Sequence, residues 1–395
     1  MKTMEEYNFN QIIDRQGTSC CQLGLLKQLF GRDDLLPLWV ADMNFAVCPD
    51  ITRALVSRLS GHPVYGYTMP ADGYLQSIID WQRSRNGFAF TREEMAFVGG
   101  VVTGFALLVE HFTRPGDAIV IQEPVYHPFR HVSEGAGRRI VNNALRPLAN
   151  GYYEMDFDGL ERIFSTEHPR LMVVCNPHNP VGIAWDADTL RRVASLARKY
   201  GVVVLSDEIH GDLMLWGNRH VVMATVSDDA AEVTVTMGAP SKTFNIAGIK
   251  SSWCVVKNPK LREPFFGWLA NNELSSPHLA ALVATEAAYK HGGPWLSQCL
   301  RYIEGNIDYV AGYCRDRLPG IRAVKPQASF LVWLDCRGLG LDHDSLVSLM
   351  VDRARLAMND GAMFGEAGSG FMRMNVGVPR SVLVEAMGRI EQALR

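Results

Sequence analysis

The sequence predicts an α/β protein with a large domain built on a mainly parallel β-sheet and a smaller α+β domain. Between residues 95 and 256, short β-rich runs alternate with helical patterns, which is typical of parallel strands joined by helices. These runs tend to be apolar on both faces, as expected for strands that helices cover on either side. After about residue 287 the alternation stops. We therefore predict a large domain over residues 49–287 and a small domain formed by residues 288–395 together with the N-terminal segment 1–48.

The expected elements follow in chain order. In the large domain the strands are Met95–Val98, Ala118–Gln122, Arg170–Cys175, Val202–Ser206, Val233–Met237 and Ser251–Val256. Residues 186–200 are expected to form a helix capped by Asp186, because apolar residues recur on one face at helical spacing. In the small domain we expect a long amphipathic helix over Trp295–Arg317, a strand over Ala328–Asp335 and a helix over Asp344–Ala357.

Composition narrows the class of protein. A chain of 395 residues with 47% hydrophobic and 21% charged residues fits an ordinary soluble globular protein. The net charge of −3 and the lack of a basic stripe argue against a nucleic-acid partner. The longest apolar run, Ala96–Val109, is broken by glycines and is too short to span a membrane. The polar N-terminus does not resemble a signal peptide, and the eight cysteines include no CxxC pair. We therefore predict a cytoplasmic protein with reduced thiols and no metal site.

Polar side chains follow three consecutive strands of the predicted sheet. Asn179 lies in a turn rich in proline and glycine after the third strand, Asp207 follows the fourth, and Lys242 follows the fifth in a segment of small residues. Ligands of open parallel sheets bind at the carboxyl ends of the strands. The spacing therefore predicts that an amide, an acid and a lysine meet in one crevice.

This ordered set indicates a pyridoxal 5′-phosphate (PLP) site. A lysine among small residues can hold an aldehyde cofactor covalently and later move a proton. Asp207 would pair with the pyridine nitrogen and Asn179 would donate to the ring phenolate oxygen. His210, three residues after Asp207, would reach the phenolate side or support Asp207. Taken singly, each residue has an ordinary alternative, which is a helix cap for the acid, a turn for the amide and a solvated surface position for Lys242.

Several motifs along nearly the whole chain resemble a known family. The chain resembles the fold-type I PLP enzymes of the class I/II aminotransferase superfamily and, more narrowly, the MalY/PatB group of cystathionine β-lyases, or C–S lyases. The matching segments are Leu38–Met43, Val64–Tyr67, Glu123–Phe129, Cys175–Gly182, Ser206–His210, Ser241–Gly248 and Phe371–Asn375. The resemblance implies an aspartate aminotransferase-like fold with a seven-stranded sheet in the large domain.

The resemblance also implies roles for further residues. Tyr126 matches the aromatic residue that stacks on the pyridine ring, and Arg373 matches the arginine that holds the substrate carboxylate. Tyr67 matches a tyrosine that reaches the neighbouring subunit's site, which implies a homodimer with shared active sites. The residues implied in phosphate binding are Val101, Val102, Thr103, Ser241 and Lys250, the last in place of an arginine common in aminotransferases. Those implied at the substrate are Arg373, Tyr67, Trp39 and Asn179. Departures from the family pattern at Asn44, Met69, Val181 and Ala328–Phe330 leave the exact amino-acid substrate open.

We therefore hypothesise a C–S β-lyase that splits L-cystathionine or a related S-conjugate of L-cysteine into a thiol, pyruvate and ammonia. The alternative is an aminotransferase, which needs the same residues and differs in the fate of the carbanion. Pyruvate formed without an added keto acid separates these two. A third hypothesis is a regulatory or binding protein that has kept the fold; it would lack visible cofactor absorbance or would not need Lys242.

Overall fold

The computed structural model describes residues 6–395, and their largest feature is a seven-stranded sheet. Its strand order is β2-β10-β9-β8-β7-β3-β4, with β10 antiparallel to both neighbours and the other pairs parallel. The strands are β2 (Met95–Val98), β3 (Ala118–Ile121), β4 (Arg139–Asn142), β7 (Leu171–Cys175), β8 (Val203–Asp207), β9 (Thr234–Gly238) and β10 (Ser252–Val256). The six predicted strands are confirmed to within one residue at each end. The seventh, β4, was not predicted because it lies at the edge and buries none of its side chains.

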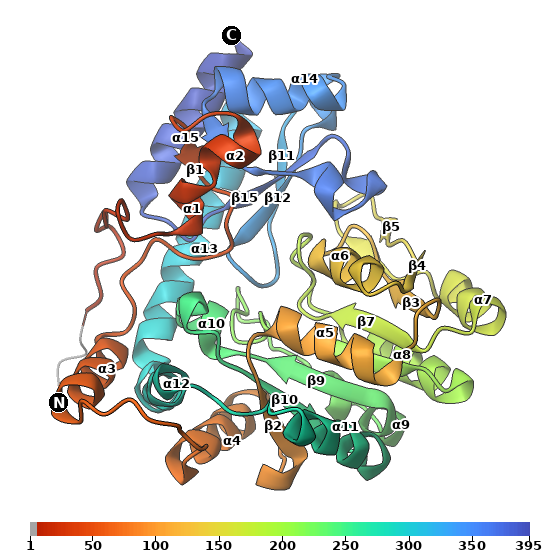
Figure 1. Cartoon of the computed structure of the whole chain (residues 1–395). Coiled ribbons are helices and arrows are strands. Elements are labelled where there is room, and N and C mark those ends of the chain that lie inside the picture. Colours follow the sequence, from red (N-terminus) through yellow and green to blue (C-terminus); the bar gives the residue numbers. More distant parts are fainter. Residues whose placement is uncertain (1–5) are drawn as a thin grey trace.

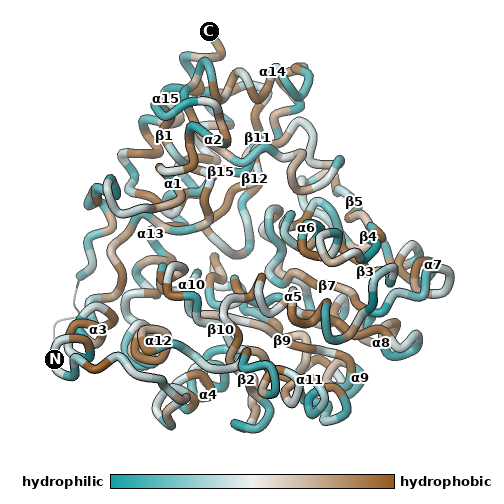
Figure 2. Tube along the Cα trace, in the orientation of Figure 1, coloured by the Kyte–Doolittle hydropathy of each residue, from teal (hydrophilic) through white to brown (hydrophobic). Residues whose placement is uncertain are grey.

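Helices cover both faces of this sheet (Figure 1). One face packs against α5 (Val101–Phe112), α6 (Pro128–Gly135) and α11 (Pro259–Asn271), and the other against α7 (Phe157–Glu167), α8 (Ala187–Tyr200) and α9 (Asp228–Val233). Successive side chains of a strand point to opposite faces. Strand β7 therefore contributes to both of the hydrophobic cores that flank the sheet. Leu171 and Val173 join the first, while Met172 and Val174 join the second. Figure 2 shows the hydrophobic character of the central strands.

Helix α8 begins and ends where the sequence predicts. The carboxylate of Asp186 accepts the N–H of Thr189 at 2.7 Å, which satisfies one of the free amides of the first turn. Gly201 ends the helix in the left-handed conformation, with φ of 69°, which glycine adopts without a steric penalty. The predicted helix is confirmed.

A four-stranded antiparallel sheet lies in the C-terminal part of the chain. Its order is β11 (Arg322–Val324), β12 (Leu331–Asp335), β15 (Phe371–Asn375) and β14 (Asn359–Asp360). Helices α13 (Gly293–Arg317) and α15 (Arg380–Leu394) share a hydrophobic core with it, and α13 confirms the predicted long helix. The short strand β1 (Leu36–Pro37) pairs with β13 (Leu356–Ala357). The N-terminal segment therefore lies against the C-terminal part, while the domain boundaries stay a prediction.

The predicted helix Asp344–Ala357 is wrong in its second half. Helix α14 covers only His343–Ser348, a π-helical turn follows over Leu349–Arg353, and Leu356–Ala357 form β13. Arg355 has φ of 57°, a left-handed conformation that ends a right-handed helix, and the next two residues pair with β1. The predicted strand Ala328–Asp335 begins only at Leu331, after Ser329 with φ of 77°.

The remaining elements are short segments and helices outside the two sheets. They are α1 (Cys21–Gly24), α2 (Leu26–Phe30), α3 (Pro49–Gly61), α4 (Asp72–Asn86), α10 (Pro240–Thr243), α12 (Leu279–His291), β5 (Arg146–Pro147), β6 (Tyr153–Glu154) and the single turns η1 (Arg92–Glu94), η2 (Met223–Thr225), η3 (Ala247–Ile249), η4 (Arg337–Leu339), η6 (Gly361–Phe364) and η7 (Glu366–Gly368). No helix within residues 6–395 is both long and apolar enough to cross a membrane.

Candidate active site

A cavity of about 240 Å³ opens at the carboxyl ends of β7, β8 and β9. These strands are adjacent and parallel, with Cys175, Asp207 and Met237 in register, so the segments that follow them meet at one edge. All predicted site residues except Tyr67, Trp39 and Arg373 line the cavity. The lining residues among those predicted are Val101, Val102, Thr103, Tyr126, Asn179, Asp207, His210, Ser241, Lys242 and Lys250. The structure therefore brings the amide, the acid and the lysine together.

Asp207 is the last residue of β8, and its side chain is deeply buried at the cavity floor. Its Oδ1 accepts the N–H of Ile209 at 3.1 Å. Burial, together with the neighbouring Glu208 carboxyl, raises the pKa of Asp207 to about 7. A carboxyl in this position is fully ionised at neutral pH only beside a positive group. The protonated ring nitrogen of a pyridine cofactor is such a group, so the site fits PLP.

The amine of Lys242, in the short helix α10, donates a hydrogen bond to the carbonyl oxygen of Ala41. Burial lowers the pKa of Lys242 to about 8; the nearby Arg373 also lowers it, whereas Asp42 and Asp207 raise it. A much larger fraction of the amine is then uncharged at neutral pH than for an ordinary lysine. An uncharged amine is what attack on an aldehyde and abstraction of a Cα proton both require.

The N-terminus of α5 forms one wall of the cavity, where Gly99, Gly100 and the first helical turn lie. Gly100 has φ of 122°, a conformation that L side chains rarely adopt. Free N–H groups at a helix N-terminus favour an anion. The hydroxyl-bearing Ser241 and the exposed Lys250 line the same cavity. Amide, hydroxyl and ammonium donors of this kind fit a phosphate group.

Arg373 lies on β15 behind the cavity wall and is 3% exposed. Its guanidinium donates to the Oδ1 atom of Asn179 and to the carbonyl oxygen of Trp39, each at 3.0 Å, and also to the Oδ1 atom of Asn359. No acid pairs with it within residues 6–395, and its Nε has no hydrogen-bond partner there. Burial lowers the pKa of Arg373 to about 10. A buried guanidinium without an anion fits a substrate carboxylate.

The contact with Arg373 orients the Asn179 amide. Because its oxygen accepts from the guanidinium, its nitrogen remains as a donor at the cavity. Tyr126 and His210 contribute rings to the same cavity. Burial raises the pKa of Tyr126 and, together with the positive Lys242 and Arg373, lowers the pKa of His210 to about 3. Both rings are therefore neutral near pH 7.

Two predicted residues lie apart from the cavity. Tyr67 is fully exposed in the single chain. Trp39 contributes its carbonyl oxygen to Arg373, whereas its indole N–H donates to the carbonyl oxygen of Gln22 at 3.1 Å. Sequence reasoning missed Asn359 and Phe364, which hold Arg373 by a hydrogen bond and by a ring 4.8 Å from the guanidinium carbon. Neither lies in a motif that marks it.

A buried hydrogen-bonded pair supports the turn after β8. The Oε2 atom of Glu208 lies 2.7 Å from Nε2 of His220, and the two side chains are only 3% and 2% exposed. The Oε1 atom of Glu208 accepts from Ser206 Oγ at 2.8 Å and from the N–H of Met223 at 3.0 Å. The carboxylate thus ties the start of the 208–223 loop to its end.

Replacing His220 with alanine is expected to lower the free energy of unfolding by about 3 kcal/mol, because a buried carboxylate loses its partner. Urea unfolding would measure the loss. The exposed pair of Lys199 and Glu161 offers a control, since Lys199→Ala should cost less than about 1 kcal/mol. Similar losses in the two variants would contradict the supporting role of His220.

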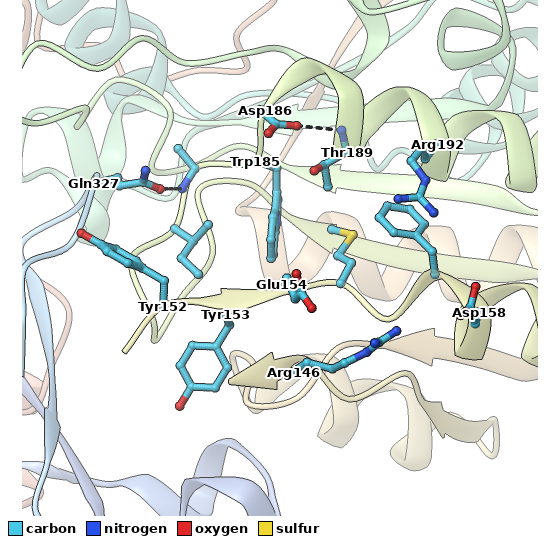
Figure 3. A pocket seen from close by; sticks show the side chains of 14 residues that line it. Arg146, Tyr152, Tyr153, Glu154, Asp158, Trp185, Asp186, Thr189, Arg192 and Gln327 are labelled. Atoms are coloured by element: carbon cyan, nitrogen blue, oxygen red, sulfur yellow. Dashed lines mark hydrogen bonds between the residues drawn. The ribbon is translucent and has the colours of Figure 1, made fainter. Parts of the chain in front are cut away.

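A second cavity, of about 490 Å³, lies beside the residues that follow the Asn179 turn (Figure 3). Three of its charged side chains already have partners. Arg146 pairs with Asp156, Asp186 caps α8, and the Arg192 guanidinium carbon lies 3.7 Å from the centre of the Phe157 ring. Within residues 6–395 no unpaired buried polar atom faces this cavity, so the first cavity is the candidate active site.

Comparison with known proteins agrees with this geometry. Residues 33–390 match the family model "Aminotransferase class I and II". Cystathionine β-lyase PatB of Bacillus subtilis is 40% identical, covering 98% of this chain and 100% of the relative. Protein MalY of Escherichia coli is 33% identical, covering 98% and 99%. The crystal structure of cystalysin from Treponema denticola, which contains pyridoxal 5′-phosphate, is 32% identical with a TM-score of 0.94, covering 99% of each chain. The chain therefore belongs to the class I and II aminotransferase family of pyridoxal-phosphate enzymes, in the group that includes PatB and MalY.

Proposed function

We propose that this protein is a PLP-dependent C–S β-lyase acting on L-cystathionine or a related S-conjugate of L-cysteine. The observation that carries the proposal is that Lys242 and Asp207 meet at one cavity while Arg373 is bonded to Asn179 in its wall. There an amine with a pKa of about 8 lies near a buried acid and a buried, unpaired guanidinium. The 40% identity with a cystathionine β-lyase over nearly the full chain favours this member of the family.

The cofactor would be held from all sides. Lys242 would form the covalent bond to its aldehyde carbon, Asp207 would pair with the ring nitrogen, and the Asn179 amide would donate to the phenolate oxygen. Tyr126 would stack on the ring, and neutral His210 would reach the phenolate side or support Asp207. The phosphate would be bound by the first turn of α5 (Val101, Val102 and Thr103), by Ser241 and by Lys250, all of which line the cavity.

The substrate carboxylate would bind to Arg373, whose remaining contacts to Asn179, Asn359 and the Trp39 carbonyl fix its orientation. PLP would hold the substrate through its amine, which would leave the Lys242 amine free to act as a base. The released Lys242 amine removes the Cα proton. PLP supplies an electron sink for the pair left on Cα. That pair forms the Cα–Cβ double bond as the Cβ–S bond breaks, and the thiolate leaves with both electrons of the broken bond. With water, the remaining fragment yields pyruvate and ammonia.

An aminotransferase is the second candidate, since the family model is named for it. It would use the same residues and return the proton to the cofactor carbon in place of expelling a thiolate. Incubating the PLP-loaded enzyme with L-cystathionine and no keto acid separates the two. We expect stoichiometric homocysteine, pyruvate and ammonia. Pyridoxamine phosphate accumulating without pyruvate would overturn the lyase proposal.

We also propose a homodimer with shared active sites. The supporting observation is a run of exposed large side chains that single chains rarely leave in water, formed by Val64, Tyr65, Tyr67 and Met69. Sedimentation of the purified protein is expected to give twice the chain mass. Mixed dimers of Tyr67→Ala and Lys242→Ala chains should regain activity, because one of their two sites is intact. Cytoplasmic location stays a prediction from the sequence.

A further inference from the structure

The residue that follows Lys242 is bonded to a buried carboxylate. Thr243 is the last residue of α10 and is fully buried, and its hydroxyl donates to the Oδ2 atom of Asp212 at 3.0 Å. Asp212 belongs to the 208–223 loop, and its side chain is only 5% exposed. Helix α10 has four residues, and a helix of that length is not stable by itself in water. A contact from outside the helix therefore helps to fix the backbone that carries Lys242.

The second oxygen of the Asp212 carboxylate is bonded to α4. This Oδ1 atom accepts from the indole Nε1 of Trp81 at 3.0 Å and lies 3.3 Å from Nε of Arg85. Arg85 also donates to the carbonyl oxygen of Asp212 at 2.9 Å. The Trp81 ring packs against Phe244, the residue after Thr243, with 5.4 Å between the ring centres. The carboxylate therefore joins the four-residue α10 to α4, a helix of 15 residues.

The far end of the Lys242 side chain is held by the segment 39–45. Its amine donates to the carbonyl oxygen of Ala41, and the side-chain amides of Asn245 and Asn375 donate to other carbonyl oxygens of the same segment. The contact with Ala41 uses the reacting amine itself, so it is interrupted when that amine bonds to the cofactor. A second anchor, away from the reacting atom, is therefore needed to keep the lysine in place.

We propose that Asp212 is a positioning residue for Lys242. Through the hydroxyl of Thr243 it holds α10 so that the lysine amine reaches the aldehyde carbon of the cofactor and, later, the Cα proton of the substrate. This charge-assisted hydrogen bond contains no reacting atom and can persist through every step. The inference rests on the proposed role of Lys242 and deepens it. The substrate carboxylate would bind Arg373, which lies on a different element, β15, so its binding should not depend on Asp212.

Two substitutions of Thr243 test the contact without removing a charge. Thr243→Val keeps the shape of the side chain but lacks the hydroxyl, whereas Thr243→Ser keeps the hydroxyl. At saturating PLP, we expect the covalent bond between Lys242 of the Thr243→Val apoprotein and the cofactor to form about 10- to 100-fold more slowly, because a small misplacement of a reacting group is costly. Stopped-flow visible absorbance measures this rate. With L-cystathionine, kcat should fall by a similar factor while KM stays unchanged. Thr243→Ser should restore most of both rates.

Arg85→Gln is the matched control, because it removes a partner of the other carboxylate oxygen and leaves the bond between Asp212 and Thr243. Both Arg85→Gln and Thr243→Val should unfold at lower urea concentration than the parent protein, but only Thr243→Val should slow the bond to PLP. Equal slowing in the two variants would mean that Asp212 only supports the fold, and this would overturn the proposal. A normal rate in Thr243→Val would overturn it as well.

A double-mutant cycle connects the effect to Asp212. The rate for Asp212→Ala combined with Thr243→Val should equal the rate for Asp212→Ala alone, because one contact is lost in either case. Effects that multiply would show that Thr243 does not act through Asp212. The proposed function has a separate test. If the parent apoprotein formed no such bond with PLP, or if Lys242→Ala still formed it, the role of Lys242 itself would fail.

Discussion

Replacing Lys242 with alanine is expected to reduce turnover by about 10⁴-fold or more, because the covalent link to the cofactor and the base at Cα are lost together. Cofactor binding should partly survive, since Asp207, Asn179 and the first turn of α5 remain. Pyruvate release and the visible spectrum of the PLP-loaded protein, measured side by side, check both parts. A variant that turns over at the normal rate would refute the assignment of Lys242.

Lys242→Arg provides the matched control. It keeps a long cationic side chain at the same position, but a guanidinium does not give up its proton in a protein. The inactivity of this variant would show that the uncharged amine, favoured here by the pKa of about 8, is what the reaction requires. Recovery of substantial activity by arginine would instead indicate that positive charge alone suffices.

Asp207→Asn is expected to weaken PLP affinity by about 10- to 100-fold, because a charge-assisted hydrogen bond becomes a neutral one. Turnover should also fall by at least about 100-fold, since a ring nitrogen that is not held protonated is a poor electron sink. Fluorescence titration of apoprotein with PLP gives the affinity, and the pyruvate assay at saturating PLP gives the rate. Unchanged values would mean that Asp207 only shapes the turn after β8.

The pKa of Asp207 adds a pH dependence with a defined sign. Without the cofactor the pKa of Asp207 is raised to about 7. The carboxyl is therefore increasingly protonated below pH 7, and it must lose this proton to pair with the ring nitrogen. As pH drops from about 8 to about 6, the PLP affinity of the parent protein should therefore fall more than that of Asp207→Asn, because asparagine has no such proton to lose. Parallel curves for the two proteins would contradict this linkage.

Much of the fold and the centre of the site follow from local patterns. The strands of the large sheet are short apolar runs with both faces buried, and such runs are recognisable without knowledge of their neighbours. Parallel order then places Asn179, Asp207 and Lys242 at one edge. The strand β4 and the end of α14 could not be predicted in this way. One is a half-exposed edge strand, and the other gives way to pairing between β13 and β1, whose partner residues are some 320 positions apart.

The site residues that could not be predicted from the sequence depend on contacts between distant segments. The guanidinium of Arg373 is held by Asn359 and Phe364, which are an ordinary asparagine and phenylalanine until β14 and β15 pair. Tyr67, by contrast, was placed by resemblance alone, and the single chain gives it no contact with the cavity. Its proposed role requires a second subunit, which no pattern within one chain can locate.

The hydrogen bonds that hold residues 39–45 also bear on how the site is assembled along the chain. The side chains that bind carbonyl oxygens of these residues follow far behind in the sequence, Asn245 by about 200 positions and Asn375 by 335. Arg373 likewise lies on β15, the last strand of the small sheet. A polypeptide that ends before β15 would therefore contain Lys242 but lack the guanidinium that we expect to orient the substrate.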